Sequence, residues 1–245
     1  MRRCTVSLLA GLAAGLFAAA ASAQPRDPSV PPGLDPGGVP VAVFADGVDY
    51  TDPLIVRRLA RDGEGDLIAW DFTDGDARPF GPTDPRIPAL LALTTSLRLI
   101  VARGAAADPA RAARLTAFAV RTAARIVVAW DTAPGRPDWA LFLEGVRRFP
   151  DRLFVIPAVT GLSYVEARAH ANLVVAARPS VVGDVVLQGE SADPGRADLF
   201  AASAAAALAA DVLADQPQLS AAEIKTRLQK QCGSGCRIGA PAQPR

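Results

Sequence analysis

Three residues of this chain have the side chains of an acid, a base and a nucleophile. They are Asp46, the only histidine, His170, and Ser203. Such groups in contact could catalyse acyl transfer, because the imidazole takes the hydroxyl proton and the carboxylate orients the imidazole. Ser203, however, lies one turn inside an alanine-rich segment that predicts a helix, where its hydroxyl is more often bonded to a backbone carbonyl. His170 falls in a predicted surface segment, so the simpler interpretation is that the three do not work together.

An acidic loop offers the only other pattern typical of a ligand site. Asp71, Asp74 and Asp76 could hold calcium, which prefers carboxylate oxygens. The same spacing is typical of a solvated loop. We therefore expect no metal and no other cofactor, with calcium as the alternative.

Two cysteines lie near the C-terminus. Cys232 and Cys236 are separated by Gly-Ser-Gly, which is flexible enough to close a small local disulfide. Two thiolates with no nearby histidine or third cysteine fall short of a zinc shell. We expect a disulfide here, and no metal.

The chain opens with the three parts of an export signal. A basic start, Met1 to Arg3, precedes an apolar run from Ser7 to Ala20 and a small-residue cleavage site that ends at Ala23. The apolar run is too short for a membrane span, so we expect no stable span after cleavage. The mature protein would begin at Gln24 and be periplasmic or secreted.

Composition predicts one folded domain after this signal. Half of the residues are hydrophobic and the net charge is +1. The arginines are scattered among acidic residues, which predicts a solvated surface and disfavours nucleic acid as a partner. The expected organisation is a signal peptide at 1–23, a flexible Pro/Gly-rich leader at 24–40, a domain at 41–230 and a tail at 231–245.

Short apolar runs alternate with amphipathic segments along the domain. Helices are predicted to start at Asp52-Pro53 and Asp108-Pro109, on which Arg111, Arg114 and Arg121 stay polar, and at the Ser220–Glu223 capping box. Further helices are predicted over 138–148 and 200–213. Continuous apolar strands between helices favour a mostly parallel sheet covered on both faces. The predicted strands are 41–44, 67–70, 97–101, 125–130, 153–156, 173–176 and 185–187.

Several segments match one family in order. Residues 41–49, Val-Ala-Val-Phe-Ala-Asp-Gly-Val-Asp, resemble the first catalytic strand of subtilisin-like serine proteases, Val-Ala-Val-Ile-Asp-Thr-Gly-Val-Asp. Residues 197–202, Ala-Asp-Leu-Phe-Ala-Ala, resemble the nucleophile segment, Gly-Thr-Ser-Phe-Ala-Ala. Residues 125–135 and 154–161 are similar to the groove strand and the oxyanion segment. The resemblance implies an α/β three-layer sandwich with a mostly parallel central sheet.

The resemblance also assigns the catalytic positions. The family's aspartate falls on Ala45, its serine on Leu199 and its oxyanion asparagine on Val159. The histidine falls on Asp84 or is deleted, and Pro85 and Pro88 suggest that the helix of this part is rebuilt. Because leucine has no proton to lose and no lone pair to attack with, the triad chemistry cannot run from Leu199.

The sequence therefore predicts an exported, catalytically inactive subtilisin-like pseudo-protease. Its remnant groove would bind a peptide or protein, because an extended peptide is held by main-chain bonds that need no catalytic residue. The alternative is an active serine hydrolase with a rearranged triad. The expected groove residues are Trp130, Asp131, Gly135, Ala158 and Gly161.

Overall fold

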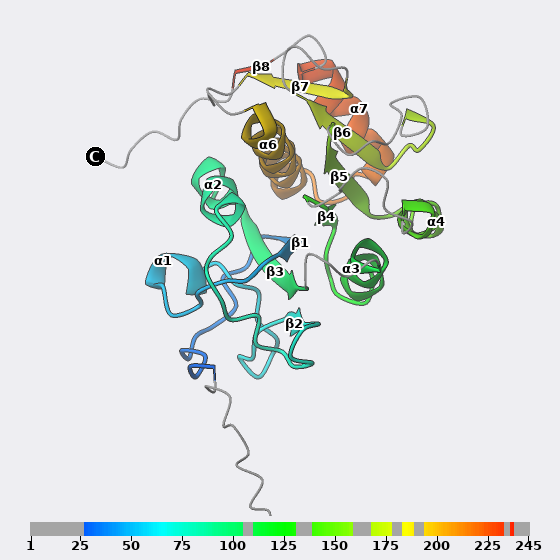
Figure 1. Ribbon diagram of the computed structural model, residues 1–245. Coiled ribbons are helices and arrows are strands. Elements are labelled where there is room, and N and C mark those ends of the chain that lie inside the picture. The colour runs from blue at the N-terminus through cyan, green and yellow to red at the C-terminus, as the bar shows by residue number, and fades with distance from the viewer. Residues whose placement is uncertain are drawn as a thin grey trace, which may run out of the picture.

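The computed structural model describes residues 27–104, 110–130, 139–158, 168–177, 183–188, 194–232 and 236–237. Its centre is a parallel sheet of eight strands in the order β2-β3-β1-β4-β5-β6-β7-β8 (Figure 1). The buried apolar runs of the sequence form these strands, which confirms the predicted α/β class with a mostly parallel sheet. Their bounds are β1 Val39–Ala45, β2 Ala69–Asp71, β3 Leu97–Arg103, β4 Ile126–Val128, β5 Leu153–Pro157, β6 Leu173–Ala177, β7 Val185–Gln188 and β8 Cys236–Arg237.

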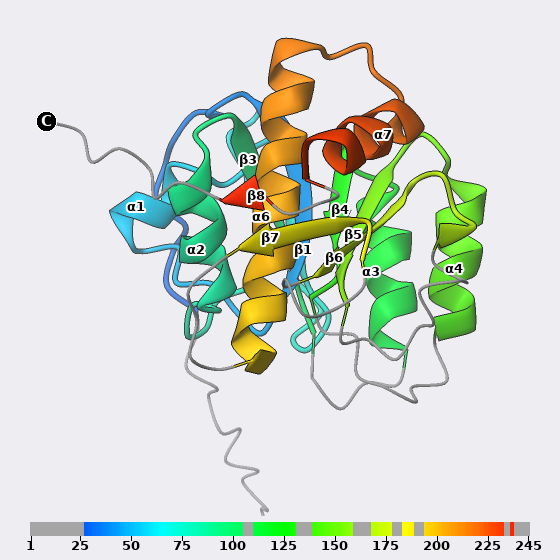
Figure 2. The same ribbon diagram turned by 90° about the horizontal axis from the view of Figure 1, so that it is seen from above.

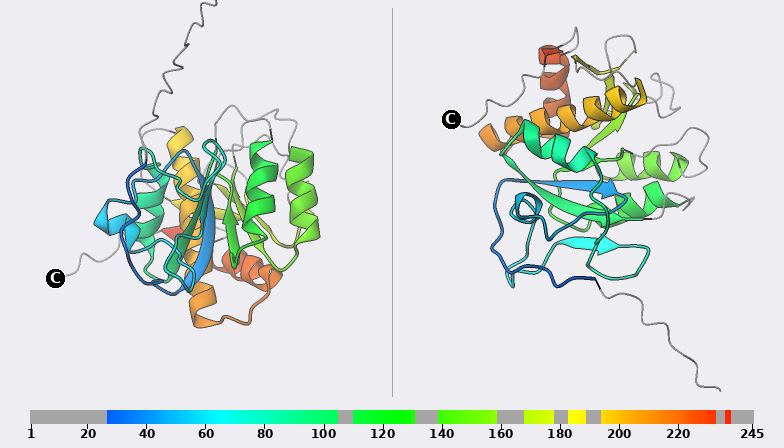
Figure 3. Two further views of the ribbon diagram at one scale, coloured as in Figure 1. Left: turned by 90° about the horizontal axis from the view of Figure 1, so that it is seen from below. Right: turned by 60° about the vertical axis from the view of Figure 1, so that its left-hand side comes forward.

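Helices cover both faces of the sheet. One face carries α2 (Arg86–Leu93), α6 (Pro194–Asp215) and α7 (Ala221–Cys232), and the other carries α3 (Arg111–Ala119) and α4 (Trp139–Arg148) (Figures 2 and 3). Successive strand residues point to opposite faces. Val41, Val43 and Ala45 of β1 therefore join the core under α2 and α6, whereas Ala42 and Phe44 join the core under α3 and α4.

Local sequence signals set several helix ends as predicted. Asp52 caps α1 (Pro53–Val56) by accepting the Leu54 backbone N–H at 2.8 Å. Ser220 and Glu223 exchange hydrogen bonds at the start of α7, as a capping box does. The alanine-rich α6 is buried along most of its length, so it packs as closely against the sheet as small side chains allow. Among the described residues, no helix is long and apolar enough to cross a membrane.

Helix α2 lies where the sequence carries Pro85 and Pro88. These prolines suggested that the helix of this part is rebuilt, and the structure has a helix that begins at Arg86. The two prolines occupy the cap and the first turn, where backbone N–H groups have no partner inside the helix in any case. Proline therefore costs little at these two positions.

The leader contacts the domain more closely than its composition predicts. Val39 and Pro40 belong to β1, which begins two residues before the expected boundary. Tyr50 Oη donates to the Pro28 carbonyl at 2.9 Å, and burial raises the pKa of Tyr50 to about 12. Asp35 pairs with Arg98 and accepts the Arg61 backbone N–H at 2.9 Å. Residues 28–35 are thus bonded to the folded domain.

Candidate functional site at the carboxyl edge of the sheet

The site lies where the direction of the chain through the sheet reverses. Strand β1 is flanked by β3 and β4, and the chain leaves β1 towards β2 on one side and leaves β4 towards β5 on the other. In open α/β sheets, ligands bind outside the carboxyl ends of the strands at such a point. Here these ends are Ala45 of β1 and Val128 of β4.

Three arginines converge on Asp46, the residue after β1. Arg111 of α3 donates to Asp46 Oδ1 at 2.8 Å, and Arg86 of α2 lies 3.9 Å from Asp46 Oδ2. Arg103, the last residue of β3, donates to the Asp46 backbone carbonyl at 3.0 Å. We call this group, with the acids that pair with it, the edge cluster. It connects the helices of both faces across the end of β1.

Two buried carboxylates provide counter-charges for arginines of the edge cluster. Asp84 accepts Arg86 Nε at 2.6 Å and bonds Nη2 of the same guanidinium. Asp71 accepts Arg103 at 2.8 Å and also holds the backbone N–H groups of Thr73 and Asp74. The side chains of Asp84 and Asp71 are 1% and 0% exposed, so both charges depend on these partners.

The outer surface of the edge cluster is acidic. The carboxylates of Asp46 and Asp74 are 62% and 46% exposed, whereas Arg86 and Arg111 are 15% and 2% exposed. Nearby Asp27 has a raised pKa because of its burial and the negative charges of Asp76 and Asp74. Among the described residues at this edge, the carboxylates of Asp46 and Asp74 are therefore the more exposed charges, and the guanidinium groups of Arg86 and Arg111 lie beneath them.

Aromatic rings support two of the arginines. The Arg86 guanidinium lies 5.2 Å from the centre of the Trp130 ring, and that of Arg111 lies 4.8 Å from the centre of the Phe44 ring. Trp130 is only 1% exposed, and its indole N–H has no hydrogen-bond partner among the described residues. The Trp130 ring therefore packs against the guanidinium that Asp84 holds.

The catalytic equivalents assigned by the resemblance fall in different surroundings. Ala45 is fully buried under α2 and α6, and Asp84 is buried in its ion pair with Arg86. Leu199 belongs to the backbone of α6, but its side chain lies outside the described residues, as does Val159. Of the expected groove residues, Trp130 and partly buried Ala158 are described, and Asp131, Gly135 and Gly161 lie outside the description.

The structure separates Asp46, His170 and Ser203. Asp46 follows the carboxyl end of β1, and His170 precedes the amino end of β6. Because all the strands are parallel, these are opposite edges of the sheet. Ser203 is fully buried in α6. This particular rearranged triad is therefore not assembled.

Asp71 of the acidic loop is engaged by the protein itself, and calcium at this loop stays an alternative prediction. Asp71 already accepts Arg103 and two backbone N–H groups, so its charge is neutralised and its lone pairs are engaged. In the described part of the chain, no group of three or more His, Cys, Asp or Glu side chains is placed to hold a metal ion. The expectation of a purely solvated loop also needs correction, because Asp71 is fully buried.

The cysteines are only partly described. Cys232 is buried at the end of α7, and Cys236 begins β8, which pairs with β7. The side chain of Cys236 lies outside the described residues. The disulfide stays a prediction.

The sequence did not predict the arginines of the edge cluster. They were expected on a solvated surface, and Arg111 was expected to face solvent from its helix, yet it is 2% exposed. The one local signal is Asp84-Pro85-Arg86, in which the acid and base lie two residues apart. The Arg103–Asp71 and Arg111–Asp46 pairs join residues 32 and 65 positions apart, so only the fold brings them together.

Comparison with known proteins supports the fold and nothing narrower. No family model and no curated protein sequence matches the chain. A solved cold-adapted subtilisin-like serine proteinase matches with a TM-score of 0.55 and 15% identity, covering 85% of this chain and 87% of that one. A psychrophilic protease matches with a TM-score of 0.48 and 16% identity, covering 80% and 84%. The first likeness shows that the fold is subtilisin-like.

Proposed function

We propose that this chain is an exported, catalytically inactive protein of subtilisin-like fold that binds a peptide or another protein at the carboxyl edge of its sheet. The edge cluster carries the proposal. Buried Ala45 and ion-paired Asp84 stand where the resemblance places two triad members. The methyl group of Ala45 cannot orient a base, and the carboxylate of Asp84 is engaged by the Arg86 guanidinium instead of taking a proton from a nucleophile.

The proposed binding mode is an extended peptide held by backbone hydrogen bonds at the strand ends. The segments that would hold it run from Trp130 to Gly135 and from Ala158 to Gly161. Ala158 is the described residue best placed to test this mode, because it follows β5 and remains partly exposed. The exposed carboxylates of Asp46 and Asp74 favour peptides with basic side chains.

Activity is tested with a fluorescent fluorophosphonate, which labels reactive serines. The mature protein from Gln24 onward would be treated beside an active subtilisin. No labelling of this chain, with full labelling of the control, is the expected result. Stoichiometric labelling would contradict the hypothesis that the protein is catalytically inactive and would favour a serine hydrolase with a rearranged triad. Mapping the labelled residue would then identify the nucleophile.

Peptide binding is tested on an array of short peptides with the wild type and two variants. A158E places a charge at the proposed edge, and A222E makes the same change at an exposed position of α7. We expect peptides retained by the wild type and by A222E to lose about tenfold in affinity with A158E. Equal retention by all three proteins would place binding elsewhere, and no retained peptide would reject the binding role. Thermal melting would show that A158E is folded.

Export and the disulfide belong to the same proposal. N-terminal sequencing of protein recovered outside the cytoplasm should begin at Gln24, with the signal removed after Ala23. Alkylation of the unreduced, unfolded protein should leave Cys232 and Cys236 unmodified, and prior reduction should expose both. Recovery of the uncleaved chain from the cytoplasm would contradict the export step.

A further inference from the structure

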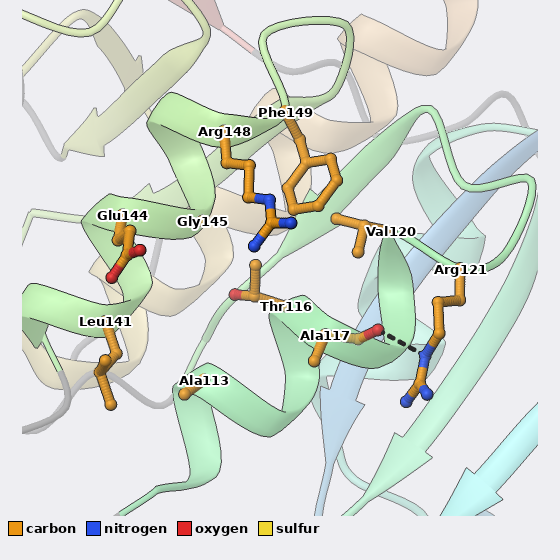
Figure 4. Close-up of a pocket in the computed structure, with 10 residues that line it drawn as sticks. All are labelled: Ala113, Thr116, Ala117, Val120, Arg121, Leu141, Glu144, Gly145, Arg148 and Phe149. Carbon is orange, nitrogen blue, oxygen red and sulfur yellow. Dashed lines mark hydrogen bonds between the residues drawn. The ribbon is translucent and has the colours of Figure 1, made fainter.

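A concave surface lies on the face of the molecule away from α6. Helices α3 and α4 run beside each other there and enclose a groove of about 410 Å³ (Figure 4). Its walls include Ala117 and Val120 of the α3 side and Leu141 and Phe149 of the α4 side. Leu141 is 52% exposed, so the groove offers apolar surface that the protein itself does not cover.

The shape of the groove depends on a close approach of the two helices. A Cβ atom at Gly145 of α4 would lie 2.3 Å from Cγ2 of Thr116 on α3. Only glycine allows the helix backbones to approach this closely at that level. Beyond this crossing the space between the helices forms the groove.

Arginines at the helix ends give the groove a positive charge. Arg121 and Arg148 line it, and Arg147 lies beside Arg148 on the exposed surface of α4. In the part of the chain that the structure describes, none of the three forms an ion pair. Figure 4 shows the Arg148 guanidinium directed from α4 towards Thr116, beside Phe149. Glu144 is the one acidic residue among those that line the groove.

Helix dipoles explain only part of this arrangement. Cations near a helix C-terminus are stabilised by the helix dipole, and Arg121 Nε donates to the Ala117 carbonyl at the end of α3. Neither effect neutralises the full charges. An exposed apolar groove, with guanidinium groups at its rim that form no ion pair with described residues, complements a ligand that is both apolar and anionic.

We propose that the α3–α4 groove binds an acidic polypeptide segment of a partner protein, with an apolar side chain between Leu141 and Val120 and carboxylates against Arg121 and Arg148. The concave shape favours an inserted side chain over a flat anionic membrane. Guanidinium groups suit carboxylates because they donate in a planar fork. This surface is separate from the carboxyl edge, so this proposal can be tested independently of the peptide site proposed there.

The test uses fluorescence anisotropy of a roughly 12-residue amphipathic peptide that carries leucine at helical spacing and glutamate elsewhere. A second peptide has lysine in place of every glutamate. The R121E/R148E variant reverses the two groove charges, and R57E/R227E makes the same change in net charge at exposed arginines outside the groove. An L141N variant tests the apolar contact.

We expect the mature protein to bind the glutamate peptide and not the lysine peptide. R121E/R148E should weaken binding about tenfold or more, L141N by several-fold and R57E/R227E by less than twofold. Equal binding of both peptides, or equal weakening in the two charge-reversal variants, would overturn the proposal. Binding to anionic lipid vesicles with no binding of the glutamate peptide would also overturn it, in favour of a membrane surface.

Discussion

Two regions of this molecule use arginine in opposite ways. In the edge cluster, Arg86 and Arg111 are 15% and 2% exposed, and each pairs with a carboxylate. In the α3–α4 groove, Arg121 and Arg148 are exposed and form no ion pair in the described structure. The residue type is the same, and only the surroundings differ.

The difference follows from the free energy of burying a charge. Burying a guanidinium without a counter-charge costs several kcal/mol, so each edge arginine needs a carboxylate partner. Arginines in water have no such requirement, and their field stays available to a partner. The edge cluster is therefore expected to contribute mainly to folding and the groove arginines mainly to binding. A net charge of +1 for the whole chain conceals this division.

The largest contrast should appear when one arginine is removed from each region. R86A leaves the carboxylate of Asp84, which is 1% exposed, without its guanidinium and uncovers the Trp130 ring. We expect the free energy of unfolding to fall by about 3 kcal/mol or more. The matched R148A, on an exposed side chain without an ion pair in the described structure, should change it by less than about 0.5 kcal/mol. Urea unfolding measures both, and similar losses would remove the distinction between the regions.

A second contrast lies inside the edge cluster. Arg103 pairs with buried Asp71 at 2.8 Å and with half-exposed Asp74 at 3.2 Å. We expect D71A to lower the free energy of unfolding by about 2–3 kcal/mol, because it removes the buried one of two carboxylate partners of Arg103 and the acceptor of two backbone N–H groups. D74A should cost less than about 1 kcal/mol. Equal destabilisation in denaturant unfolding would show that burial is not what gives these pairs their strength.

The sequence predicted the fold better than it predicted either region. Strands such as 41–44 and 153–156 are continuous apolar runs, and Ser220–Glu223 caps a helix through residues three positions apart. These signals are local, so they can be read before the fold is known. The edge cluster joins α2, β3 and α3 through partners far apart in the chain. The α3–α4 groove depends on Gly145 facing Thr116, and nothing in the sequence marks that pair.

The groove can be altered without touching its charges. G145A places a methyl group 2.3 Å from Thr116 Cγ2 and should force α3 and α4 apart. Overpacking of this kind costs about 1–3 kcal/mol, and the better helix propensity of alanine offsets up to about 1 kcal/mol. We expect a lower melting temperature for G145A and partial recovery in G145A/T116S, which lacks the opposing methyl group. If T116S gave no recovery, the close crossing would not be the cause of the loss.

The smallest expected effect is that of the positive charge of Arg147 on the pKa of His170. The pKa of His170 lies below its ordinary value of 6.5 because of burial, then the positive charges of Arg147 and Lys225. Since His170 is the only histidine, NMR can follow its ring protons without overlap from others. R147Q should raise this pKa, although burial would still hold it below 6.5. R148Q is the matched control, and an equal shift in both variants would contradict a specific effect of Arg147.

The same shift has a consequence for stability. Between the folded pKa of His170 and its ordinary value of 6.5, the unfolded chain binds more protons than the folded protein. The contribution of His170 to the free energy of unfolding therefore falls as the pH drops through this window, and it stops falling below the folded pKa. R147Q narrows the window, so its stability should decline less than that of the wild type over the same pH range.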